Sequence, residues 1–158
     1  STLAGAGAQT FFVPGVPDVG LTPAALAEGP LAAAGVSQLA QSFNSGLAAQ
    51  LPALANGLGL DIITFDTFAL VNAVVADPTA FGFTNVTGPC NLADAGNGCA
   101  SPGEYLFWDG IHPTTAGHAV IGREAGERLA AALVPIPAAA PLFLAGLAAL
   151  ARAARRRV

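Results

Sequence analysis

Residues 105–115, YLFWDGIHPTT, decide the fold that this sequence predicts. The first four of them are bulky, apolar or aromatic, which is typical of a short buried strand. The strand runs directly into a turn that contains Asp109 and His112. Pro113 then offers a favourable first position for a helix that we expect to extend to about residue 133. The stretch therefore predicts a strand, a tight turn and a helix in immediate succession.

Strands and helices also alternate in the preceding sequence. We predict strands at residues 10–13 and 60–65, where β-branched and aromatic residues gather, and helices at residues 31–56 and 68–76. The first helix has one apolar stripe, which we expect to face the core, formed by Leu39, Phe43, Leu47, Leu51 and Leu54. This alternation indicates the α/β class with a parallel sheet of three visible strands.

Local signals set the boundaries of these helices. Thr22 is a predicted cap for a short helix beginning at Pro23, and Asp66 or Thr67 for the helix at residues 68–76. We expect Pro52 to kink the long helix or end it early. Residues 79–103 are predicted to be a long irregular loop, a kind of segment that is usually functional or covalently stapled.

Asp109 and His112 lie where a parallel sheet places chemistry, beyond the carboxyl end of a strand. An aspartate that accepts a hydrogen bond from one imidazole nitrogen leaves the other nitrogen free to take a proton from a serine hydroxyl. The pair alone is also compatible with a helix-capping aspartate beside a surface histidine. Asp18, in a Pro-Asp-Val-Gly segment, is expected to be a turn residue.

The context of the pair resembles a known family. Residues 107–114, FWDGIHPT, and the following TAGH resemble the last conserved block of the GDSL (SGNH) lipase/acylhydrolases, which carries the Asp and His of a Ser-Asp-His triad. Weaker resemblance extends over residues 5–133, for example at residues 12–23. It implies part of a flavodoxin-like, three-layer SGNH hydrolase fold, Asp109 and His112 as catalytic residues, and a carboxylic-ester or lipid substrate.

The family's Gly-Asp-Ser block, which holds its nucleophile, has no counterpart here, and neither do its oxyanion-hole Gly and Asn. We therefore expect the chain to be the C-terminal portion of a longer hydrolase whose serine lies upstream of Ser1, and to be inactive alone. The alternatives are a non-catalytic, surface-anchored module that retains part of the fold, and a purely structural secreted domain.

Other polar residues receive structural interpretations. His118 is expected to bond a nearby backbone group rather than join Asp109 and His112 as a metal ligand, and Trp108 to pack rather than line a pocket. No cofactor or metal is expected. The net charge of −4, with only 10% charged residues, offers no basic surface for nucleic acid.

Cys90 and Cys99 flank a polar loop rich in Gly, Asn and Asp. They form a disulfide if the compartment is oxidising, and are free thiols if it is not. Closing so short a loop stabilises the fold by about 2.7 kcal/mol in the chain-entropy model.

From residue 134 the composition changes. A Val-Pro-Ile-Pro-Ala motif, an apolar stretch and an arginine-rich end resemble the PEP-CTERM sorting signals in their Val-Pro-x-Pro-Ala variant. We therefore divide the chain into a hydrolase portion, residues 1–133, and a sorting signal, residues 134–158. The resemblance implies export from a Gram-negative cytoplasm to the periplasm or cell surface, a transient membrane anchor through a C-terminal hydrophobic helix, and cleavage by an exosortase-type protease. The apolar stretch at residues 138–151 is shorter than the roughly 20 residues that span a bilayer, and an amphipathic or buried terminal helix is the alternative.

Overall fold

The computed structural model describes residues 2–91 and 98–133, and its first half is built around two parallel strands. After the short helix α1 (Thr2–Gly5), strand β1 (Thr10–Pro14) pairs with β2 (Asp61–Phe65), in register from Thr10 opposite Asp61 to Pro14 opposite Phe65. The crossover between them contains η1 (Val19–Leu21), α2 (Pro23–Ala27) and the long helix α3 (Pro30–Leu58). The aromatic rings of Phe12 and Phe65 stack across the pair, with centroids 5.8 Å apart.

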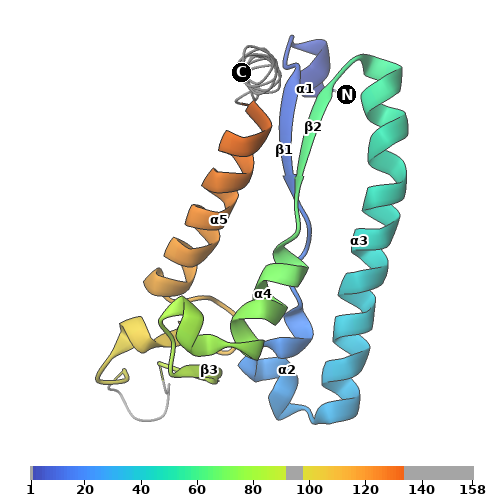
Figure 1. The fold of residues 1–158 in the computed structure, drawn as a ribbon. Helices are drawn as coiled ribbons and strands as arrows, with labels where there is room; N and C mark the ends of the chain where they lie inside the picture. Colours follow the sequence, from blue (N-terminus) through green and yellow to red (C-terminus); the bar gives the residue numbers. More distant parts are fainter. Residues whose placement is uncertain (1, 92–97, 134–158) are drawn as a thin grey trace, which may run out of the picture.

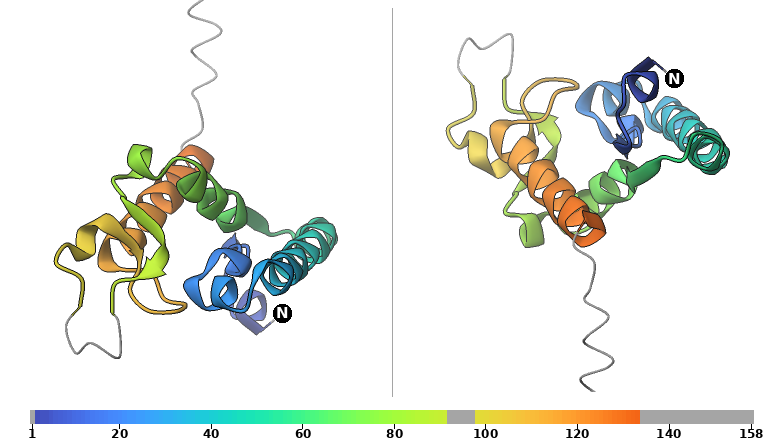
Figure 2. Two further views of the ribbon diagram at one scale, coloured as in Figure 1. Left: turned by 90° about the horizontal axis from the view of Figure 1, so that it is seen from below. Right: turned by 90° about the horizontal axis from the view of Figure 1, so that it is seen from above.

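The second half supplies a separate strand pair and the last helix. It runs through α4 (Thr67–Ala76), η2 (Pro78–Phe81), β3 (Asn85–Pro89), η3 (Pro102–Glu104), β4 (Tyr105–Phe107) and α5 (Thr115–Leu133). Strand β3 pairs in parallel with β4, with an irregular register between Asn85 and Pro89. Helices α3 and α5 lie on opposite sides of the β1–β2 pair, and α4 lies beside α5 (Figures 1 and 2).

Caps fix the starts of α2 and α4 where the sequence predicted them. The Thr22 hydroxyl accepts the Ala25 N–H at the start of α2, with Pro23 as the first helical residue. The Asp66 carboxylate accepts the Ala69 N–H at 2.9 Å at the start of α4. Helix α3 continues beyond the predicted end to Leu58, where Gly59 adopts the left-handed conformation (φ 64°) that glycine tolerates.

The main cluster of buried apolar residues lies on the elements from α4 onward. Side chains from α4, β3, β4, α5 and the loop before β3 form it, comprising Val74, Phe83, Val86, Leu106, Phe107 and Val120. Two of its members, Leu106 and Phe107, belong to the strand that leads into the turn with Asp109 and His112, so the cluster anchors one end of that turn.

Helix α3 packs differently from the prediction. The predicted apolar stripe is largely exposed, with Leu39 71% and Phe43 57% accessible, whereas Ala33 and Ala40 are buried. In its N-terminal part α3 makes close contacts through small residues, because the chain around Gly20 approaches the helix too closely for a larger side chain. Further along, Leu47 and Leu51 are half-buried and face Val13 and Phe65 of the strand pair. The other three residues of the predicted stripe, Leu39, Phe43 and Leu54, are exposed in the described structure.

Three further expectations about the fold are corrected. The strand at residues 105–107 is not the third strand of the β1–β2 sheet, because it pairs with β3, which lies within the segment predicted to be irregular. Pro52 does not end α3, which continues for six residues beyond it to Leu58. The last helix begins at Thr115, since Pro113 forms an antiparallel bridge with Phe107.

The predicted sorting signal, residues 134–158, lies outside the described residues. Among the helices that the structure describes, none is long and apolar enough to cross a membrane.

Candidate active site

Asp109 and His112 meet in the turn between β4 and α5. The Nδ1 atom of the His112 ring lies 2.8 Å from Oδ2 of Asp109. The other carboxylate oxygen, Oδ1, accepts the backbone N–H groups of Ile111 at 2.8 Å and of His112 at 2.6 Å. The carboxylate thus caps the turn with one oxygen and orients the imidazole with the other.

These hydrogen bonds favour the charged carboxylate. The pKa of Asp109 falls from 3.8 to about 2, chiefly because of the His112 backbone N–H, then the Ile111 N–H, then the His112 ring. Asp109 is therefore ionised at neutral pH. The His112 side chain is 72% exposed and that of Asp109 41% exposed, so the rest of the ring is open to a reacting partner.

Backbone hydrogen bonds close the base of the turn and dock its tip. Trp108 donates its N–H to the His112 carbonyl at 2.8 Å, and Thr114 donates its N–H to the Leu106 carbonyl at 2.9 Å. At the tip, the Gly110 carbonyl accepts the Ala24 N–H of α2 at 2.9 Å. The turn is therefore fixed both by its flanking residues next to β4 and by α2 from the first half of the chain.

Thr114 and Gly117 fix the following helix against β4. The buried Thr114 hydroxyl donates to the Tyr105 carbonyl at 2.6 Å and accepts the Gly117 N–H at 3.1 Å. At Gly117 a Cβ atom would lie 2.8 Å from the Leu106 carbonyl oxygen, so only glycine allows this approach. Neither residue was singled out for this role from the sequence.

An apolar cavity of about 220 Å³ opens beside His112, between α4 and α5. Its aliphatic lining comprises Leu70, Val71, Val74, Leu106, Val120 and Ile121. Asp18, Thr22 and His112 add polar atoms to its wall. The volume exceeds the roughly 150 Å³ of an engineered cavity that takes up benzene, so a short aliphatic chain or an aromatic ring fits.

Asp18 is more than the turn residue that the sequence predicted. It is 4% exposed and accepts the Ser37 hydroxyl of α3 at 2.5 Å, the Asn72 amide of α4 at 3.0 Å, and the Gly20 N–H at 3.2 Å. Asp18 therefore links three segments behind the cavity. Its partners lie 19 and 54 residues away, so no local pattern could reveal them.

The remaining candidates have structural contacts. The ring of His118 contacts the Thr114 carbonyl at 3.0 Å, which confirms the predicted backbone bond. The disulfide between Cys90 and Cys99 is present. The Trp108 ring, 40% exposed, lies against Gly98. Within residues 2–91 and 98–133, no three His, Cys, Asp or Glu side chains lie close enough together to hold a metal ion.

Comparison with known proteins assigns the family. The sequence profile described as GDSL-like Lipase/Acylhydrolase matches residues 1–125, and the chain belongs to this family. The family assignment makes the chain part of an ester-hydrolase family with a mixed α/β fold and parallel strands.

Several relatives carry related names. A GDSL esterase/lipase of Arabidopsis thaliana is 29% identical in an alignment 130 residues long, which covers 75% of this chain and 36% of that protein. Esterase EstA of Pseudomonas aeruginosa is 35% identical in an alignment 121 residues long, which covers 67% of this chain and 17% of EstA. The anther-specific proline-rich protein APG of Brassica napus is 28% identical in an alignment 135 residues long, which covers 77% of this chain and 30% of that protein. The chain thus spans about a third of the length of the Arabidopsis relative.

Proposed function

We propose that Asp109 and His112 are the orienting carboxylate and the general base of an ester hydrolase whose nucleophilic serine lies outside residues 1–158. The observation that carries this proposal is the 2.8 Å contact between Asp109 Oδ2 and His112 Nδ1 on an exposed turn. This contact fixes the proton on Nδ1 and leaves Nε2 as the acceptor.

The chemistry follows from that arrangement. The serine oxygen attacks the ester carbonyl carbon while its proton passes to His112 Nε2. The resulting imidazolium is stabilised by the ionised Asp109 and returns the proton to the departing alkoxide, which leaves as an alcohol. Water gives a proton to the same nitrogen as its oxygen attacks the acyl-serine carbonyl carbon. When the bond between that carbon and the serine oxygen breaks, His112 returns the proton to the serine oxygen, which releases the carboxylic acid and regenerates the free serine.

Two serines of the chain form hydrogen bonds away from His112. The Ser37 hydroxyl donates to buried Asp18, and the Ser45 hydroxyl donates to the Gln41 carbonyl within α3. In the described part of the chain, the hydrogen bond of the His112 ring goes to Asp109 and not to a serine. Together with the greater length of the relatives, this supports a nucleophile from additional sequence.

The cavity beside His112 supports a substrate that carries an apolar group next to its ester bond, either a simple carboxylic ester or a lipid. Nearly all of its lining is aliphatic, and burying such a group stabilises the complex by about 0.8 kcal/mol per methylene. The esterase and lipase names of the relatives support the same substrate class.

We further propose that residues 1–133 are the hydrolase portion and residues 134–158 a PEP-CTERM-type sorting signal. In this proposal the protein is exported, is held transiently in the membrane by the signal's apolar stretch, and is released by an exosortase-type protease. The Cys90–Cys99 disulfide supports an oxidising destination.

The test is hydrolysis of p-nitrophenyl butyrate by the longest natural form of the protein. We expect His112→Ala to lower kcat on the order of 10³-fold, the contribution typical of a general base. His118→Ala is the matched control, and we expect it to stay within a few-fold of wild type because its ring contacts only the helix backbone. Absence of hydrolysis in the natural form would favour the non-catalytic module instead.

A further inference from the structure

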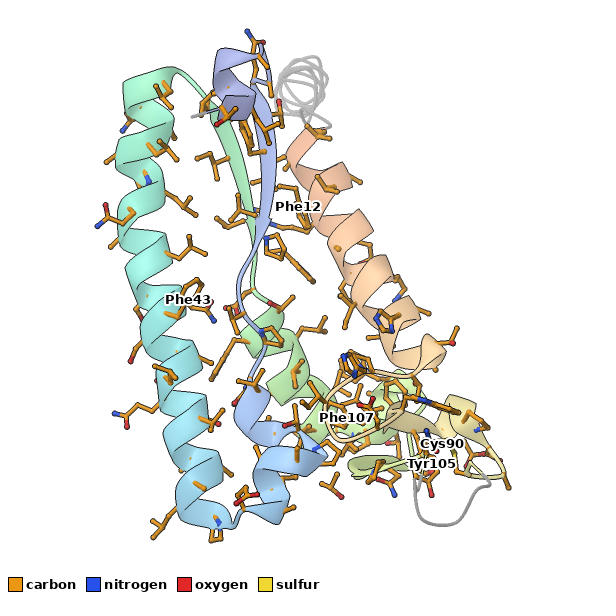
Figure 3. All side chains as sticks on the ribbon, turned by 180° about the vertical axis from the view of Figure 1, so that it is seen from behind. Phe12, Phe43, Cys90, Tyr105 and Phe107 are labelled. Atoms are coloured by element: carbon orange, nitrogen blue, oxygen red, sulfur yellow. A yellow bond between two sulfur atoms is a disulfide. The ribbon has the colours of Figure 1, made fainter. Side chains whose placement is uncertain are left out.

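The Cys90–Cys99 disulfide lies against the strand end that precedes the catalytic turn. Cys90 donates its N–H to the Phe107 carbonyl at 3.0 Å, and Asn91 donates its N–H to the Trp108 carbonyl at 2.6 Å. Figure 3 shows Cys90 beside Tyr105 and Phe107. On the other side of the disulfide, Cys99 donates its N–H to the Cys90 carbonyl at 2.8 Å.

The backbone of Trp108 connects the residues around the Cys90–Cys99 disulfide to the turn that carries Asp109 and His112. Its carbonyl accepts from Asn91, next to the disulfide, while its N–H donates to the His112 carbonyl at 2.8 Å. The next residue is Asp109. The Trp108 ring lies over Gly98, where an added Cβ would be 3.5 Å from the ring edge. Backbone and side chain of Trp108 therefore both contact the residues that the disulfide holds together.

Strand β3 supplies little alternative support for this strand end. The N–H groups of Thr87 and Gly88 donate to the side chain of Asn85, at 3.2 and 2.8 Å. Pro89 has no N–H, and the β3–β4 register is irregular over the same residues. On the side of β3, the N–H groups that bond the carbonyls of Phe107 and Trp108 are thus those of Cys90 and Asn91.

We propose that the Cys90–Cys99 disulfide is a positioning element for the Asp109–His112 pair, and that reducing it lowers the activity of the site. The activity part of this inference rests on the proposed ester hydrolase. Cys90 is fully buried, but Cys99 is partly exposed, so an external dithiol can reach its sulfur. Two electrons from the dithiol break the S–S bond, two protons complete the Cys90 and Cys99 thiols, and the dithiol becomes a disulfide.

Reduction removes the covalent bond that holds Cys99 and its neighbour Gly98 beside Cys90. The Gly98 contact with the Trp108 ring and the Cys99 bond to Cys90 are then no longer enforced covalently. Trp108 gains freedom, and with it the carboxylate of Asp109, whose three hydrogen bonds depend on the shape of the turn. The base loses its fixed orientation although no catalytic side chain has changed.

The test is a carboxyl-carbon NMR titration of Asp109 in the full 158-residue chain, oxidised and after treatment with a phosphine reductant. We expect the midpoint to lie at about 2 in the oxidised chain and to rise toward 3.8 on reduction. At pH 3 the oxidised carboxylate is then mostly ionised and the reduced one mostly protonated. Cys90→Ala combined with Cys99→Ala is expected to behave like the reduced chain, and reoxidation to restore the first titration.

The fold is monitored in the same samples through the Gly15 amide, which bonds to Phe65 across β1 and β2. An unchanged Asp109 midpoint with this amide intact overturns the inference. So does loss of the Gly15 signal on reduction, because the disulfide would then merely maintain the fold.

A second arm separates the inference from the proposed function. In the longest natural form, reduction is expected to lower kcat for p-nitrophenyl butyrate at least about tenfold, a part of the roughly 10²- to 10⁴-fold that a general base contributes, with KM little changed. If the Asp109 midpoint moves but no form hydrolyses esters, the proposed function fails while the positioning role stands. If hydrolysis depends on His112 but is indifferent to reduction, the inference about activity fails and the proposed function stands.

Discussion

Replacing Asp109 with asparagine isolates the charge that holds the turn. Asparagine keeps an oxygen for the Ile111 and His112 N–H groups but loses the negative charge. The pKa of Asp109 falls from 3.8 to about 2 on folding, which corresponds to roughly 2.4 kcal/mol at 1.36 kcal/mol per unit. Because the side chain is 41% exposed, solvent screening reduces this to about 1 kcal/mol.

The pH dependence has a definite sign. A carboxylate whose folded pKa is lowered stabilises the fold above its unfolded pKa, near 3.8, and loses that contribution as pH falls through about 2. Asp109→Asn should therefore lower the free energy of unfolding by about 1 kcal/mol at pH 7. The gap to wild type should close between pH 4 and pH 2.

Urea unfolding followed by circular dichroism at several pH values measures this difference. Asp77→Asn is a matched control, since the Asp77 carboxylate caps η2, far along the chain from the turn, and has no contact with His112. The stability difference between this variant and wild type therefore reports nothing about the Asp109–His112 pair. Equal stability of Asp109→Asn and wild type at pH 7, or a gap that persists at pH 2, would refute the electrostatic account of the turn.

Other substitutions test the surrounding packing by the same unfolding assay. Gly117→Ala should cost about 2 kcal/mol because its Cβ would meet the Leu106 carbonyl, whereas Gly122→Ala, with open space around it, should be neutral or stabilising by about 0.5–1 kcal/mol. A similar result for both glycines would contradict the close approach of α5 to β4. Thr114→Val should cost about 1–2 kcal/mol through its two lost hydrogen bonds, and no loss would show that water replaces them. Asp18→Ala should lower the free energy of unfolding by about 3 kcal/mol because the donors of Gly20, Ser37 and Asn72 lose their acceptor. Unchanged stability would contradict the role of Asp18 in linking these segments.

Features set by neighbouring residues were predictable from the sequence. Thr22 before Pro23, and Asp66 before α4, form caps because the accepting side-chain oxygen and the backbone N–H donor lie within one turn of helix. The meeting of Asp109 and His112 is equally local, since they are three positions apart in a tight turn. The disulfide joins two cysteines nine residues apart.

Features set by distant contacts were not predictable. The long helix was expected to bury its leucines, but its contact face is set by Gly20 and by Asn44, which bonds both the N–H and the carbonyl of Val16. Strand β3 was missed because its proline- and glycine-containing sequence is typical of a loop, and only its pairing with β4 makes it a strand. Local patterns carry no information about such partners.

The central claim is that His112 activates a serine outside residues 1–158. The most direct measurement is labelling of the longest natural form with a fluorophosphonate, followed by peptide mapping of the modified residue. The account predicts one labelled serine outside these 158 residues, and labelling that becomes much slower in His112→Ala but not in His118→Ala. A label on a serine within the 158 residues, or labelling that does not depend on His112, would contradict it.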